Sequence, residues 1–247
     1  MTIKKFLFEF LIVVAGVLVA LALNGWNDSR LEARSEANYL ALLSRDLDDT
    51  IQDLEALVEF EGKQLDDALN AYRAVTATEK PANTAVLAAA MARLATRKTM
   101  VLKNSTYEDL VSTGHLHLIR NAALRNRVVD FYEVTERQFE IVNRNNAFYI
   151  DNMYTANVTL SGLVQFKVGT NHPGLNNLAD ELTAKLGPGY QIDHGRLWKL
   201  PADAPEWSMV KSNLVARATV STFAQAGGNE KLTEARVLKA AIDEERG

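Results

Sequence analysis

An apolar stretch near the first residues of the sequence limits the structures that this chain can form. Lys4 and Lys5 precede residues 6–26, which are mostly apolar, with one glutamate near the beginning and one asparagine near the end. A helix of this length measures about 31 Å, close to the hydrocarbon thickness of a bilayer. We therefore expect residues 1–27 to form a transmembrane anchor in contact with membrane lipid.

Two other interpretations of the stretch are weaker. A cleaved secretory signal also joins a basic start to an apolar middle, and Ala20-Leu21-Ala22 has the small residues of a cleavage site. However, Glu9 falls inside the apolar region, and the region is longer than such signals usually are. A buried helix of a soluble domain is disfavoured because residues 10–23 are apolar on every face.

The flanking charges decide little about orientation. Two lysines precede the stretch, and Arg30 and Arg34 follow it among acidic residues, so the basic residues are balanced. The amino-terminal charge, the short tail before the stretch and an interfacial Trp26 favour a cytoplasmic N-terminus. The rest of the chain would then face the periplasm.

Six residues of the stretch share one helical face. Steps of three and four residues connect them: Glu9, Val13, Gly16, Ala20, Asn24 and Asn27. Gly16 and Ala20 form a small-x-x-x-small pair that lets a second backbone come close, and Asn24 can hydrogen-bond across such a contact. We call these six residues the membrane stripe, and we expect the chain to form a homo-oligomer through it.

Glu9 has two explanations. It lies four residues after Lys5, so it can pair with that lysine or reach the lipid headgroups. Alternatively, a ring of Glu9 carboxylates at the mouth of an oligomeric pore would favour cations. An ion channel lined by Glu9 and Asn24 is therefore the alternative to a self-assembling scaffold.

Helical periodicity continues beyond the apolar stretch. Residues 28–75 contain no proline, and their apolar residues recur at helical spacing: Leu40, Leu43, Leu47, Ile51, Leu54, Val58, Leu65, Leu69 and Tyr72. The opposite face is charged, which indicates a long stalk helix that packs its apolar side on partner helices. We expect residues 28–157 to form this stalk and a helical domain, giving a mainly α fold.

Further helices are predicted after the stalk. A connector at 76–84 leads to a short helix at 85–96. Asn104 opens a capping-box pattern for a short helix that ends near Gly114. Asn121 then caps a long helix that reaches about residue 154.

The last part of the chain, residues 158–247, is expected to be less regular. Glycines and prolines mark a turn-rich segment that contains one short helix at 177–186. A pair of C-terminal helices follows, and Gly227-Gly228 is predicted to separate them.

The residues that usually carry chemistry form no known motif. None of the four histidines, His115, His117, His172 and His194, completes a metal-binding pattern, and there is no nucleophile elbow or phosphate loop. The absence of cysteine excludes disulfides, thiol catalysis and cysteine-based metal sites. We expect no catalytic, cofactor-binding or metal-binding residue and no enzyme, although an anchored hydrolase using His172 or His194 is a third alternative. The net charge of -4 is spread along the chain and disfavours a nucleic-acid partner.

Two segments resemble a known family. They are EFLIVVAGVLVALALNGWND at residues 9–28 and NSTYEDLVSTGHLHLIRNAALRNRVVDFY at residues 104–132. Together they resemble a group of uncharacterised bacterial single-span membrane proteins that are classified as a domain of unknown function. The matching residues are Glu9, Gly16, Ala20, Leu21, Asn24, Trp26 and Asn27, then Thr106, Tyr107, Leu110, Ser112, Gly114, Leu118, Ile119, Asn121, Leu124 and Arg125.

The resemblance implies a retained bacterial membrane anchor and little more, because the family has no assigned activity. We expect this anchor to lie in the inner membrane. Together with the residue patterns, the resemblance leads us to expect a membrane-anchored helical scaffold or sensor-like module. We expect this module to assemble with itself or with an unidentified protein partner.

Overall fold

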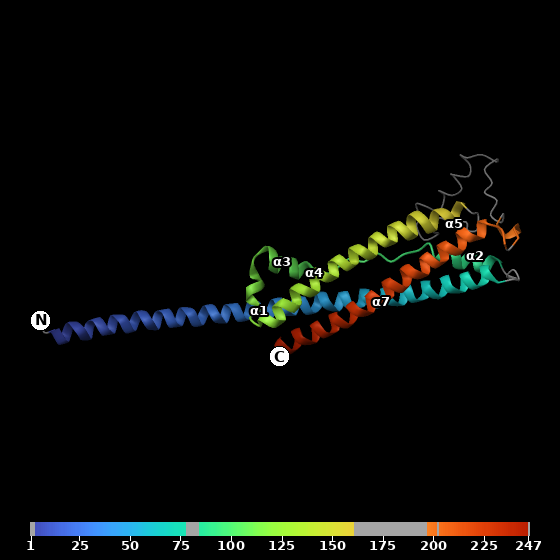
Figure 1. The fold of residues 1–247 in the computed structure, drawn as a ribbon. Coiled ribbons are helices and arrows are strands. Elements are labelled where there is room, and N and C mark those ends of the chain that lie inside the picture. The colour runs from blue at the N-terminus through green and yellow to red at the C-terminus, as the bar shows by residue number, and fades with distance from the viewer. Residues whose placement is uncertain (1–2, 78–83, 161–196, 202, 247) are drawn as a thin grey trace, which may run out of the picture. The chain divides into compact units, whose positions relative to one another are not determined.

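The computed structural model describes residues 3–77, 84–160, 197–201 and 203–246 (Figure 1). The described elements are, in order, α1 (Ile3–Thr76), α2 (Thr84–Arg93), α3 (Ser105–Ser112), η1 (His115–Leu118), α4 (Ala122–Asn145), η2 (Asn146–Thr155), α5 (Ala156–Leu160), η3 (Leu197–Lys199) and α7 (Glu206–Arg246). No strand occurs within these ranges, so the expected mainly α fold class is confirmed.

Helix α1 is one uninterrupted helix of 74 residues, drawn from blue to cyan in Figure 1. It starts in the apolar stretch and passes without a break into the predicted stalk. No proline interrupts it, and the three glycines within it each cost only about 1 kcal/mol of helix propensity. Among the described residues, α1 is the one helix long and apolar enough to cross a membrane.

The buried side of α1 follows alternating steps of three and four residues. Its members are Leu40, Leu43, Leu47, Thr50, Leu54, Leu57, Glu61, Gln64, Ala68, Ala71 and Val75, and Ser44 is also buried but falls outside this alternation. This is heptad spacing, which keeps one face against neighbouring helices over many turns.

The predicted apolar stripe of the stalk agrees with this buried face only in part. It matches at Leu40, Leu43, Leu47 and Leu54, but Leu69 and Tyr72 are each 37% exposed. The polar residues Glu61 and Gln64 are buried, so in this part of α1 the buried face cannot be recognised from apolar residues.

The chain forms two compact units. Unit 1 comprises Met1–Ile51, Lys103–Val134 and Glu234–Gly247, and unit 2 comprises Gln52–Leu102 and Thr135–Thr233. Helices α1, α4 and α7 each contribute residues to both units. The domain boundaries expected after residues 27 and 157 stay predictions.

In unit 1, helix α3 begins against α1. The backbone N–H of Thr106 donates to Asp46 Oδ2 at 3.0 Å, and so does Ser105 Oγ at 3.5 Å. The side chain of Asn104 makes no cap and instead donates to Glu108 Oε1 at 2.8 Å. The helix thus begins where predicted, but the capping carboxylate comes from α1, where a negative charge faces the positive end of the α3 dipole.

The end of α3 also agrees with the prediction. Gly114 has a φ of 73°, a left-handed conformation that glycine adopts without strain. Asn121 Oδ1 accepts a hydrogen bond from the backbone N–H of Leu124 at 3.1 Å, which confirms it as the cap of α4.

The long helix predicted after Asn121 changes its winding partway. Helix α4 passes into η2, a π-helical segment of ten residues, and then into α5. Polar side chains beside this change hold the extended segment before α3. Asn143 exchanges two hydrogen bonds with the backbone of Met100, and Asn146 Nδ2 donates to the carbonyl of Lys98 at 3.1 Å.

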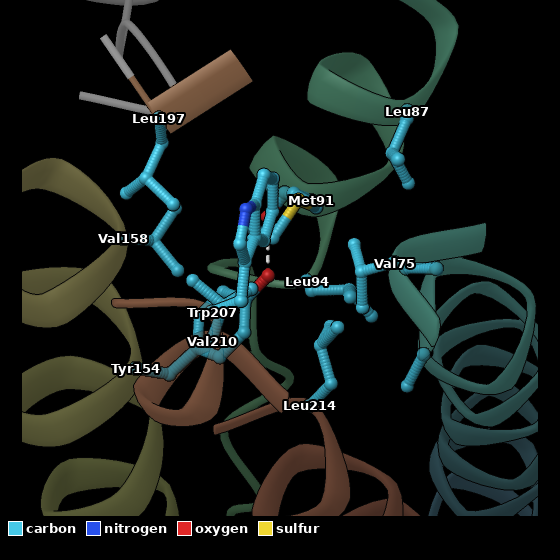
Figure 2. Packing of buried hydrophobic residues seen from close by; sticks show 12 residues of the cluster. Val75, Leu87, Met91, Leu94, Tyr154, Val158, Leu197, Trp207, Val210 and Leu214 are labelled. Atoms are coloured by element: carbon cyan, nitrogen blue, oxygen red, sulfur yellow. Dashed lines mark hydrogen bonds between the residues drawn. The ribbon is translucent and has the colours of Figure 1, made fainter. Parts of the chain in front are cut away.

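The core of unit 2 gathers residues from α1, α2, η2, α5, η3 and α7 (Figure 2). Trp207 is 5% exposed and lies among Met91, Val158 and Leu197. Tyr154 Oη donates to the carbonyl of Met91 at 2.8 Å, and burial raises the pKa of this tyrosine. Aromatic burial of this kind supplies much of the apolar area in a small core.

The expected pair of C-terminal helices is wrong, because α7 is a single helix of 41 residues that includes Gly227 and Gly228. Neither glycine has a positive φ. A Cβ on Gly228 would lie 3.0 Å from Val58 Cγ2 and 3.4 Å from Leu57 Cδ2. Gly228 therefore allows α7 to approach α1 closely. In the sequence, a glycine with this packing role cannot be distinguished from a glycine that ends a helix.

The predicted short helix at 177–186, the histidines His172 and His194, and most of the predicted turns lie outside the described residues.

Candidate functional site

The membrane stripe lies on one face of α1. Glu9 and Asn27 are eighteen residues apart, which is five turns at 3.6 residues per turn. All six stripe residues are exposed, and nothing lies within 4 Å of a Cβ built on Gly16. The described part of the chain therefore leaves this face open to lipid or to another helix.

Polar side chains at the end of the apolar stretch interact locally. Asn24 Nδ2 donates to Asp28 Oδ2 at 3.0 Å, so one amide donor of Asn24 is used within its own helix. The guanidinium of Arg30 lies 5.9 Å from the centre of the Trp26 ring, within the range of a cation–π contact. The side chain of Lys5 is outside the described part, so its pairing with Glu9 stays a prediction.

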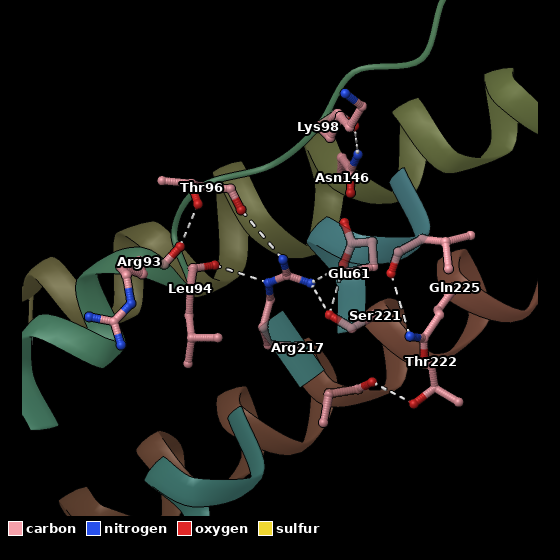
Figure 3. A network of polar contacts seen from close by, with 12 residues as sticks. Glu61, Arg93, Leu94, Thr96, Lys98, Asn146, Arg217, Ser221, Thr222 and Gln225 are labelled. Atoms are coloured by element: carbon pink, nitrogen blue, oxygen red, sulfur yellow. Dashed lines mark hydrogen bonds and ion pairs between the residues drawn. The ribbon is translucent and has the colours of Figure 1, made fainter. Parts of the chain in front are cut away.

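A buried polar network connects α1 to α7 in unit 2 (Figure 3). Arg217 Nη1 lies 3.0 Å from Glu61 Oε2, and both side chains are 0% exposed. Ser221 Oγ donates to the same carboxylate oxygen at 2.8 Å. Arg217 also donates to two backbone carbonyls that follow α2, from Nε to Leu94 at 3.0 Å and from Nη2 to Thr96 at 3.4 Å.

This network brings together three separate segments around one charge pair. A buried ion pair adds little net stability compared with an apolar replacement, but losing one partner is costly because the other charge stays buried. The network therefore favours one register of α1 against α7 within unit 2. Glu61 Oε1 has no hydrogen-bond partner among the described residues.

Sequence reasoning missed this network. Arg217 lies three residues after Leu214 and Glu61 lies four residues after Leu57, so both charges occupy positions on buried helix faces. Heptad counting from Leu40 would have placed Glu61 in the core. The pairing with Arg217, 156 residues later, has no local signal.

The two neighbouring histidines take part in a small polar cluster of unit 1. Tyr39 Oη donates to Asp109 Oδ2 at 2.9 Å and lies 3.1 Å from His115 Nδ1. The hydrogen bond to the Asp109 carboxylate raises the pKa of Tyr39. His115 and His117 both lie in the turn η1, with their ring centroids 6.3 Å apart.

Tyr39 and His115 of this cluster are half-buried, whereas Asp109 and His117 are exposed. Within the described ranges, no three His, Asp or Glu side chains are placed to hold a metal ion. The loop histidines His172 and His194, on which the hydrolase alternative depends, are outside those ranges.

Among known proteins, no curated protein and no solved structure matches the chain. One family model does match, over residues 9–161, which is more than half of the chain. This range includes the membrane stripe and both segments on which the resemblance was based. The chain therefore belongs to DUF6090, a family of unknown function.

Proposed function

We propose that this protein is a membrane-anchored helical scaffold or sensor-like module that self-assembles through the membrane stripe and carries out no catalysis. The observation that carries the proposal is the continuity of α1. One helix contains both the apolar stretch, exposed on all sides, and the heptad face that builds the packed units. The residues packed on α1 are therefore connected through one continuous helix to the segment proposed to lie in lipid.

The stripe is the part of the anchor best suited to self-contact. In lipid, apolar side chains need no protein cover, so association depends on close backbone packing and on polar groups. Gly16 and Ala20 allow close approach, and Asn24 supplies a polar group one turn later. A second copy is the partner that this face fits, because identical stripes can meet across a two-fold axis.

We place the anchor in a bacterial inner membrane, with the N-terminus in the cytoplasm and the two units in the periplasm. Lys4 and Lys5 before the apolar stretch are compatible with this orientation, although Arg30 and Arg34 after it balance them. The stacked Arg30 and Trp26 are suited to the opposite interface.

The absence of cysteine makes the proposal directly testable. Ala20→Cys places a thiol on the stripe, and Ala22→Cys is a matched control about 200° around the helix. In carbonate-washed membranes treated with an oxidant, we expect a disulfide-linked dimer for Ala20→Cys and little for Ala22→Cys. Adding Gly16→Ile should abolish the dimer.

Equal cross-linking at both positions, or loss of the chain from washed membranes, would contradict the proposal. The same variants test the channel alternative. A membrane-impermeant thiol reagent should not react with the Ala20→Cys variant if the stripe forms a dry helix contact, whereas a water-filled pore would expose the introduced thiol.

A further inference from the structure

The turn between α3 and α4 packs beside the first residues after the apolar stretch. Arg120 Nη2 donates to the carbonyl of Ser29 at 2.9 Å, and the Arg120 backbone N–H donates to Glu36 Oε1 at 2.7 Å. Ile119 is fully buried next to it, which fixes the turn in place. All of these residues belong to unit 1. We call residues 113–120 the membrane-side turn.

The depth of this turn follows from the rise of α1. Ser29 lies three residues beyond Trp26, or about 4.5 Å along the helix axis. Tryptophan marks the boundary between hydrocarbon and headgroups, and the headgroup layer on each side is about 5–7 Å thick. The guanidinium of Arg120, in contact with Ser29, therefore lies at the level of the headgroups if residues 6–26 span the bilayer.

Two exposed arginines at this level suit phosphate, and they stand beside the exposed acids Asp28 and Glu32. The Arg120 side chain is 49% exposed, although it lies 3.5 Å from Glu36, whose own side chain is only 13% exposed. Arg30 stands over Trp26 at a similar depth. Guanidinium groups donate paired hydrogen bonds to phosphate oxygens, so both arginines match a phospholipid surface.

We propose that the membrane-side turn of unit 1 docks on the phospholipid headgroups, with Arg120 and Arg30 donating to lipid phosphates. This proposal rests on the anchoring role of α1. Unit 1 then has a second contact with the bilayer and is held at a defined height above it by the turn as well as by the helix.

The test uses the full chain in phosphatidylcholine vesicles that contain a lipid with a headgroup nitroxide. A bimane label on His117→Cys reports from the membrane-side turn, where His117 is exposed. The control is the same label on Glu133→Cys. Glu133 follows Tyr132, whose ring stacks on Tyr107 at 4.8 Å.

The control lies far from the bilayer. Tyr107 follows Thr106, which is hydrogen-bonded to Asp46. Asp46 is twenty residues beyond Trp26, about 30 Å along α1. We therefore expect several-fold stronger nitroxide quenching at position 117 than at position 133, and stronger quenching by aqueous iodide at position 133.

A second variant tests the role of the charge. Arg120→Gln in the His117→Cys background should reduce quenching by the headgroup nitroxide and increase quenching by iodide. Unchanged quenching in this variant would exclude Arg120 as a lipid contact. The labelled chain that retains Arg120 still tests the position of the turn, even if Arg120→Gln disturbs folding.

Failure of this inference differs from failure of the anchor. If the chain stays in carbonate-washed vesicles while both labels are quenched equally, the turn does not dock and the proposal is overturned. If the chain is washed off, anchoring itself fails, and the docking proposal fails with it.

Discussion

Removing the guanidinium of Arg217 is the most informative perturbation of this fold. Arg217→Met keeps an unbranched side chain but leaves the Glu61 carboxylate 0% exposed without its cation. It also removes the donor to the carbonyls of Leu94 and Thr96 and a partner of Ser221. Loss of one member of a buried ion pair typically costs about 3–5 kcal/mol, so we expect unit 2 to be destabilised by about that amount.

A double-mutant cycle separates the pair from its surroundings. Glu61→Leu alone should also destabilise unit 2, because Arg217 stays buried without a counter-charge. Combining Glu61→Leu with Arg217→Met removes both charges, and apolar replacement of a whole buried pair is often neutral or stabilising. We expect the double variant to be more stable than either single variant, although the two carbonyls left without a donor cost about 1–3 kcal/mol each.

Tryptophan fluorescence in detergent is a suitable assay. Trp198 and Trp207, with ring centroids 5.4 Å apart, both belong to unit 2. A Trp26→Phe background removes the signal from the anchor. Urea unfolding then gives the free energy for each variant from the midpoint and slope.

The matched control is Lys63→Met, on the same helix two residues from Glu61. It removes a surface pair with Glu59 in which the two side chains are 71% and 70% exposed. Such pairs contribute little, so no measurable loss is expected. If Arg217→Met proves as mild as this control, or if the two single effects simply add in the double variant, the idea of a coupled buried pair is refuted.

Two further predictions follow from close contacts elsewhere. Gly228→Val should destabilise the chain by about 1–3 kcal/mol in urea unfolding, because even a Cβ there meets Val58 Cγ2 at 3.0 Å; the exposed neighbour Ala226→Val should be nearly neutral, and equal effects would contradict the packing argument. Hydrogen bonds from Lys239 first and Ser44 second lower the pKa of Asp243, so its stabilising contribution is present at neutral pH and is lost as pH falls below about 4. Asp243→Asn should therefore lower the free energy of unfolding at neutral pH, and this free energy should then fall less on acidification than it does in the unchanged chain. If the free energy of unfolding keeps the same pH profile in the variant, Asp243 does not have this role.

Much of the candidate site was accessible from sequence. The membrane stripe depends only on residue spacing within one helix, so its geometry follows once residues 9–27 are helical. Its role in assembly stays a prediction, because a single chain does not contain the partner surface. The polar network of Glu61, Arg217 and Ser221 was not accessible, since it joins residues that are neighbours only after α1 and α7 pack together.

Features that depend on local chemistry could be predicted from the residues alone. Apolar composition and the lack of proline determined the long α1 helix, and Asn121 and Gly114 marked helix ends through their own side chain and backbone preferences. Contacts made only in the folded chain overrode two local signals for where a helix ends or is capped. Gly227-Gly228 continue a helix because Gly228 lies against Val58, and Asp46 rather than Asn104 caps α3. In each case a contact between residues far apart in the chain outweighed a local preference of about 1 kcal/mol.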